Sequence, residues 1–145
     1  MSLIRRLHPV AGGLGFAIIL LFWTSTVAVE LWGGRDAIIA WKQTLPWGLL
    51  LLIPALATTG ATGFRLGGRS PLPLVLAKKR RMPIIAANGL LVLTPSALAL
   101  AWLASQNALG VTFAVIQSVE LIAGAVNLTL MALSIRDGFR ITPRR

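Results

Sequence analysis

The sequence predicts an all-α integral membrane protein, a four-helix bundle whose chain crosses the bilayer up-down-up-down. The first observation is composition: of 145 residues, 56% are hydrophobic and 12% are charged, which is not typical of a water-soluble domain of this length. The second is the presence of four apolar runs of about 20 residues, the length a helix needs to cross a hydrocarbon core. The third is a one-sided distribution of Lys and Arg. Together they predict a single transmembrane domain over residues 1–145.

The four predicted spans are apolar runs bounded by charged residues, glycine or proline. They cover residues 10–31, 45–62, 83–104 and 109–135. Arg5 and Arg6 precede the first run as they would in a secretory signal, but its length and the lack of a small-residue cleavage site favour an uncleaved span. After it, Gly33 and Gly34 break the chain, and we expect residues 36–43 to form a short helix in the membrane interface.

The basic residues predict how the bundle is oriented. Of the 14 Lys and Arg residues, 12 precede the first span, lie between residues 65 and 82, or follow the fourth span. Only Arg35 and Lys42 fall on the opposite side. The positive-inside rule therefore places both termini and the basic loop 65–82 in the cytoplasm, in a bacterial-type inner membrane. Several Gly and Pro residues in this loop are expected to prevent a continuous helix there.

A basic run inside this loop has two candidate partners. The run comprises Lys78, Lys79, Arg80 and Arg81, in a chain whose net charge is +10. Such a patch could bind the phosphates of a nucleic acid. Its position beside a predicted span favours anionic lipid headgroups, which attract juxtamembrane charges by about 1 kcal/mol each. We therefore expect lipid-headgroup binding and no nucleic-acid partner.

Glu120 is the one acidic or basic residue deep within the fourth apolar run. Placing an ionised side chain in hydrocarbon costs roughly 2.5–3.5 kcal/mol on insertion scales, so Glu120 is expected to be protonated, paired or in contact with a wet cavity. The surrounding residues recur at three- and four-residue intervals and define one helix face. This polar and small face, which we expect to point toward protein, comprises Gln117, Glu120, Gly124, Asn127 and Met131.

Hydroxyl groups on other spans are the expected partners of Glu120. Thr24, Ser25 and Thr26 lie at about its depth in the first span, and Thr94 lies slightly deeper toward the cytoplasm, counting about 1.5 Å per residue. No buried Lys, Arg or His is expected at this level, which largely excludes an ion pair within one chain. Glu120 is then either a neutral, hydrogen-bonded acid or a carboxylate in a wet cavity. Asn88 and Asn127 are expected to belong to a second polar layer nearer the cytoplasm.

Pro54 and Pro95 lie inside the second and third predicted spans. Each removes a backbone hydrogen bond and is expected to bend its helix. Bent helices are common in membrane bundles for structural reasons alone. The alternative is that the two bends flank a ligand or ion pathway that ends near Glu120.

His8 is the only histidine and stands at the cytoplasmic mouth of the first span. Imidazole is the usual axial ligand of a b-type haem, and Met82 begins the third span at the same membrane level. A His8–Met82 pair, or two His8 side chains in a dimer, are therefore candidate haem ligands. The alternative is that His8, close to Arg5 and Arg6, is solvated or binds headgroups.

Enzyme chemistry finds little support in the residue inventory. Cysteine is absent and only four acidic residues occur, so thiol nucleophiles are excluded and no metal site is expected. Three functions remain as hypotheses. The first is a non-catalytic accessory or anchor subunit of a membrane complex, for example a redox complex with haem or quinone. The second is a proton-linked transporter or channel that uses Glu120. The third is a structural membrane protein. A homodimer or a larger complex is compatible with each.

Overall fold

The computed structural model describes residues 3–141, and its described residues are almost entirely helical, with no strand among them. Four long helical segments are each long and apolar enough to cross a membrane. The all-α class and the presence of four membrane-competent helices are therefore confirmed. The segments are α1 (Leu3–Trp32), α2 (Arg35–Gly67), a third made of α3 (Pro73–Asn88), the π-helical turn η1 (Gly89–Leu93) and α4 (Thr94–Ser105), and α5 (Val111–Ile141).

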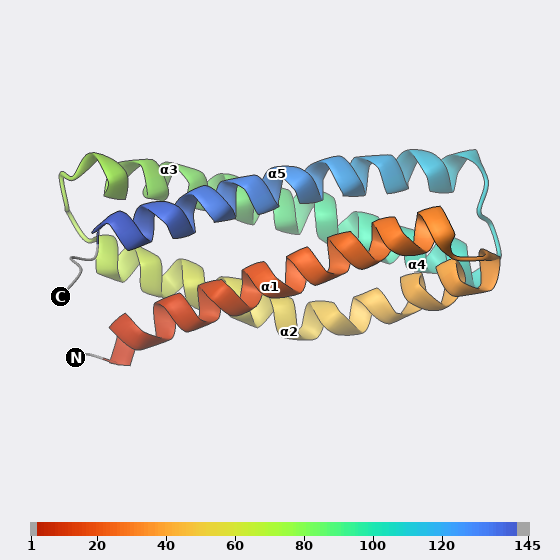
Figure 1. Ribbon diagram of the computed structural model, residues 1–145, viewed down its shortest axis with the longest axis horizontal. Coiled ribbons are helices and arrows are strands. Elements are labelled where there is room, and N and C mark those ends of the chain that lie inside the picture. Colours follow the sequence, from red (N-terminus) through yellow and green to blue (C-terminus); the bar gives the residue numbers. More distant parts are fainter. Residues whose placement is uncertain (1–2, 142–145) are drawn as a thin grey trace.

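The helices form one elongated bundle with both chain ends on the same side (Figure 1). We call this side the base; the connection between α2 and α3 lies there too, and the opposite side is the top. α1 packs along α2, α2 packs against α3 and α4, and α5 contacts both of these and α1. Because α5 returns to α1, the four segments close into a ring around a shared interior.

The helices are longer than the predicted spans. α1, α2 and α5 have 30, 33 and 31 residues. At 1.5 Å per residue these lengths exceed a hydrocarbon core of about 30 Å. The expected interfacial helix at residues 36–43 is instead the beginning of α2. The expected basic loop 65–82 shrinks to residues 68–72, because α2 continues to Gly67 and α3 already begins at Pro73.

The local sequence explains where this shorter connection begins and ends. Gly68 has φ of +43°, a conformation that side chains disfavour, and its amide caps α2 by donating to the carbonyl of Phe64. Pro73 occupies the first turn of α3, where its missing N–H removes no helical hydrogen bond. Glycine and proline here delimit two helices rather than keeping a long segment irregular.

The interior is held by a small apolar core, while much of the outer surface is apolar as well. Ile18, Ile19, Leu52 and Met131 form the buried cluster, which joins α1, α2 and α5. Many large apolar side chains on the outside are exposed, including Trp47 at 72%. An apolar exterior of this extent is expected of a surface that faces lipid.

A π-helical turn interrupts the third segment directly before a proline. Pro95 has no N–H to donate, and in a regular helix its ring would crowd the carbonyl four residues earlier. The wider turn η1 shifts the hydrogen-bond register at this point. Thr94 satisfies the carbonyl of Gly89 with its backbone N–H and with its Oγ1, at 2.9 Å from the hydroxyl.

Candidate functional site

Glu120 forms an ion pair in the interior of the bundle. The Nζ atom of Lys42 lies 2.9 Å from Glu120 Oε2. The Lys42 side chain is 1% exposed and that of Glu120 is 13% exposed. Gln117, one turn earlier on α5, donates from Nε2 to the same oxygen at 3.0 Å. The expectation that no buried cation reaches Glu120 is therefore wrong.

Lys42 reaches Glu120 because α2 begins earlier than predicted. Its position is seven residues after Arg35, or about 10 Å along the helix. From there its long side chain lies against the bundle interior rather than in a surface loop. Pro46 also lies inside α2 and has no N–H with which to bond the Lys42 carbonyl four residues before it. In the sequence the second apolar run begins only at Leu45, so the run does not reveal that the helix already includes Lys42.

A second carboxylate belongs to the same cluster. Glu30, on α1, lies within electrostatic reach of both Lys42 and Glu120. Its Oε1 is buried and has no hydrogen-bond partner, and the same is true of Oε1 of Gln117, a residue that is only 6% exposed. We call Glu30, Lys42, Gln117 and Glu120 the charge cluster. With two carboxylates and one ammonium group, its net charge is −1 when all three are ionised.

Two aromatic contacts fasten α1 to α2 next to the cluster. Trp41 donates from Nε1 to Oγ1 of Thr26 at 3.0 Å, and Thr26 lies one turn before Glu30. The ring of Phe22 meets the Trp41 ring edge-on, with centroids 6.2 Å apart. These contacts place Thr26, which is 3% exposed, at the boundary between the charge cluster and the interior below it.

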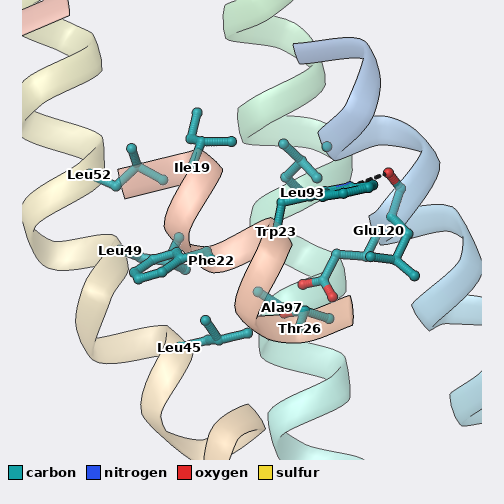
Figure 2. Close-up of a pocket in the computed structure, with 12 residues that line it drawn as sticks. Ile19, Phe22, Trp23, Thr26, Leu45, Leu49, Leu52, Leu93, Ala97 and Glu120 are labelled. Atoms are coloured by element: carbon teal, nitrogen blue, oxygen red, sulfur yellow. Dashed lines mark hydrogen bonds between the residues drawn. The ribbon is translucent and has the colours of Figure 1, made fainter. Parts of the chain in front are cut away.

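An apolar pocket adjoins the charge cluster and lies among α1, α2, α5 and the third helical segment. Its volume is about 70 Å³. Figure 2 shows Glu120 reaching from α5 into this space, with its carboxylate directed toward Thr26. Apart from these two residues the labelled lining is apolar or aromatic: Ile19, Phe22, Trp23, Leu45, Leu49, Leu52, Leu93 and Ala97.

Trp23 forms one wall of the pocket, which explains an indole so far from the predicted membrane interfaces. Its Nε1 donates to the carbonyl of Leu121 at 2.9 Å, the interaction dashed in Figure 2. The ring fits only because residue 124 is glycine, since a Cβ at Gly124 would lie 2.8 Å from Trp23 Cδ1. Gly124 therefore leaves the space that the Trp23 indole occupies in the pocket wall.

Two of the hydroxyl groups predicted as partners of Glu120 form hydrogen bonds elsewhere. Thr24 donates to the carbonyl of Leu20 at 2.7 Å within its own helix. Thr94 bonds to the carbonyl of Gly89, as described above. Ser25 does not line the pocket, whereas its neighbour Thr26 does. Of the three hydroxyls predicted on α1, Thr26 is thus the one that lines the site.

Asn88 and Asn127 meet in a layer closer to the base. Asn88 donates from Nδ2 to Asn127 Oδ1 and to the Ala123 carbonyl, both at 2.8 Å. Asn127 is 0% exposed and donates to the carbonyl of Ile85 at 3.3 Å. These bonds join the third segment to α5. A role of this layer in moving a proton or binding a ligand stays a prediction.

At the base, His8 and Met82 both lie against Gly63. A Cβ at Gly63 would be 2.9 Å from His8 Cε1 and 2.8 Å from Met82 Cε. Nδ1 of His8 lies 3.0 Å from Thr62 Oγ1, and its Nε2 lies 3.2 Å from Lys78 Nζ. Both ring nitrogens therefore contact protein atoms, and an axial haem ligand would need one of them. The haem hypothesis gains no support from this geometry.

The basic run lies on α3 rather than in a loop. Lys78 contacts His8, Lys79 donates to the carbonyl of Gly68, and Arg81 pairs with Asp137 through a 2.7 Å contact between Nη1 and Oδ2. Arg80 is exposed. Part of the run thus holds the base together, and its binding to lipid headgroups stays a prediction.

Searches against protein families, curated proteins and solved structures found no match for this chain. Among residues 3–141, no group of three or more His, Asp or Glu is arranged to hold a metal ion. Fold and site together describe a small four-helix protein of membrane-spanning character. Its distinguishing feature is a buried ion pair between α2 and α5 that adjoins an apolar pocket.

Proposed function

We propose that this protein is a small proton-linked membrane transporter that binds its solute between the helices, at the charge cluster and the adjoining pocket. The observation that carries the proposal is the contact of Lys42 with Glu120 beside a cavity that Glu120 itself lines. Ionisable groups inside a membrane bundle are costly and characteristically mark substrate, ion or proton pathways.

The energetics favour a functional role for the pair over a stabilising one. A buried ion pair regains only part of the cost of desolvating both charges, and apolar residues of similar volume are often as stable or more so. Packing alone therefore gives little reason to keep Lys42 and Glu120. If all three groups were ionised, the cluster would carry one unbalanced negative charge, which a proton on a carboxylate or another bound cation would neutralise.

The shape of the site supports solute binding. Ligand sites in proteins are concave and largely apolar, with a few polar groups that fix orientation, and in bundles they lie between helices. The pocket has this character, with Glu120 and Thr26 at one side. Leu93 and Ala97 line it from the region around Pro95, where the π-helical turn meets α4.

We also propose that the base faces the cytoplasm of a bacterial-type inner membrane. The support is the basic side chains near the base, including Lys79, Arg80, Arg136 and Arg140, against Arg35 near the top. Exposed members of this group would bind anionic lipid headgroups. The accessory-subunit and structural hypotheses stay predictions, since no contact among the described residues favours them over the transporter.

A pH jump on proteoliposomes tests the proposal without knowledge of the solute. Protons that enter the charge cluster move part of the way across the membrane and produce a transient current, measurable on a solid-supported membrane. We expect this current in the natural protein and its loss in Glu120→Gln, which leaves Glu30 and Lys42 balanced. Asp36→Asn, at an exposed carboxylate near the top, is the control that keeps the current. An unchanged current in Glu120→Gln would refute the transporter.

A further inference from the structure

We infer that the solute is a small organic monocation, a protonated amine with a short apolar body, whose ammonium group binds at Glu30 and Gln117. The inference rests on the proposed function and adds the chemical class of the solute. It begins from charge: Glu120 is neutralised by Lys42 at 2.9 Å, while Glu30 is the second carboxylate in the electrostatic reach of both. With all three groups ionised, the cluster lacks one positive charge.

The unsatisfied atoms define the kind of group that the site accepts. Glu30 Oε1 and Gln117 Oε1 are both buried, and neither has a hydrogen-bond partner. Both oxygens accept hydrogen bonds, so the missing partner has to be a donor. An ammonium group supplies three N–H donors together with the positive charge. A neutral alcohol would supply a donor but would leave the cluster with its net negative charge.

Gln117 gives this assignment evidence independent of the two carboxylates. Gln117 is only 6% exposed, and its Nε2 already donates a hydrogen bond to Glu120 Oε2 at 3.0 Å. The amide is therefore fixed with its nitrogen toward Glu120, and its oxygen is left over. A buried amide oxygen without a partner is costly in an apolar interior, and a bound donor would relieve that cost.

The adjoining pocket distinguishes an organic cation from a metal ion. Its lining is apolar apart from Thr26 and Glu120, with Phe22 and Trp23 among its walls. A bare metal ion gains no stabilisation from apolar side chains, whereas the hydrocarbon part of an amine would be buried against them. The volume of about 70 Å³ is roughly half that of a 150 Å³ engineered cavity that binds benzene, which favours a body of about four carbons.

The pairing of Glu120 with Lys42 determines how many positive charges the ligand has to carry. If Lys42 were absent, the two carboxylates would call for two positive charges. With Lys42 in place one monovalent cation balances the site, and a proton is its natural competitor. Binding of the amine then releases one proton from the cluster to the solution, so that solute and proton occupy the site alternately.

The test compares n-butylammonium with n-butanol, which has the same hydrocarbon body, and with sodium ions. Binding to the purified protein in detergent is measured by calorimetry and by the change in tryptophan fluorescence. We expect n-butylammonium to bind at least about tenfold more tightly than n-butanol, as 1.4 kcal/mol of charge-dependent binding would give. Glu30→Gln is expected to remove this preference, and Asp36→Asn to keep it.

Unfolding temperatures establish that the variants are folded. If Glu30→Gln does not fold, Gln117→Leu is the second variant, and it should weaken n-butylammonium binding more than n-butanol binding. The inference would be overturned if n-butanol or sodium ions bound as tightly as n-butylammonium. It would also be overturned if folded Glu30→Gln or Gln117→Leu kept the preference of the natural protein for n-butylammonium over n-butanol. Such results would leave the proposed function standing as long as Glu120→Gln abolishes the pH-jump current; persistence of that current overturns the proposed function itself.

Discussion

The ammonium group of Lys42 and the carboxylate of Glu120 lie 2.9 Å apart across the interior of the bundle, although 78 positions separate them in the sequence. The pair joins α2 to α5. Both of these helices also contact α1 and the third segment. Glu30 adds a second carboxylate from α1. Three helices thus contribute ionisable groups to one place, and a pocket opens beside it.

The charge balance predicts unequal effects of removing the two partners. Lys42→Met leaves Glu30 and Glu120 as two buried carboxylates and should cost about 3–5 kcal/mol of unfolding free energy, the usual loss for an uncompensated buried charge. Glu120→Gln leaves Glu30 facing Lys42 and should cost clearly less. Denaturant unfolding in mixed micelles measures both values. Equal losses would mean that Glu30 does not share the cation.

The same series forms a double-mutant cycle. In Lys42→Met/Glu120→Gln the net charge of the cluster returns to −1, so this double variant should be more stable than Lys42→Met alone. The coupling free energy between the two positions should reach about 1–3 kcal/mol, as for residues in one ion-pair network. Strictly additive losses would contradict a direct pair.

Gly124 offers a test of the pocket wall that involves no charge. Gly124→Ala places a methyl group 2.8 Å from Trp23 Cδ1, so the indole has to move, at a cost of about 1–3 kcal/mol as in other overpacked interiors. Gly60→Ala is the matched control on α2, because nothing lies within 4 Å of its Cβ. There the better helix propensity of alanine should stabilise by up to about 1 kcal/mol.

Fluorescence reports the same substitutions at the level of structure. The tryptophan emission of the protein, to which Trp23 contributes, should shift in Gly124→Ala as this indole leaves its contact with the Leu121 carbonyl, and should not shift in Gly60→Ala. If Gly124→Ala is as stable as the natural protein and its emission is unchanged, Trp23 does not pack on residue 124.

The orientation can be tested directly because the chain has no cysteine. Ser70→Cys lies in the connection between α2 and α3 at the base, and Ser105→Cys lies at the end of α4 near the top. In intact cells a membrane-impermeant maleimide should label Ser105→Cys and leave Ser70→Cys unlabelled until the membrane is opened. The reverse pattern would place the base outside.

Much of the fold follows from the sequence because membrane spans have a strong signal. Four apolar runs predicted four helices, and the polar face around Glu120 correctly pointed to the interior, where Gln117 and Asn127 are buried. Helix ends were predicted less well. Residues on either side of an apolar run lengthen a helix without making it more hydrophobic, so the apolar run alone does not show that α2 already begins at Arg35.

The error at α2 also hid the site. Depth counted from the edge of the apolar run placed Lys42 outside the bundle, whereas its long side chain lies 1% exposed in the interior. Glu30 stands near the end of the first predicted span, and its position there does not indicate that it lies beside Lys42 and Glu120. A sequence pattern fixes which helix face a residue occupies, but the meeting of Glu30, Lys42 and Glu120 depends on how three helices pack.

The central claim is that Glu30 and Glu120 share one exchangeable positive charge in addition to Lys42. The pH-jump current of proteoliposomes tests it most directly when Glu30→Gln and Glu120→Gln are compared with the natural protein and with Asp36→Asn. Either cluster substitution leaves one carboxylate for one ammonium group, so the current should vanish in both and persist in Asp36→Asn. A current that survives in Glu30→Gln or in Glu120→Gln would contradict the account.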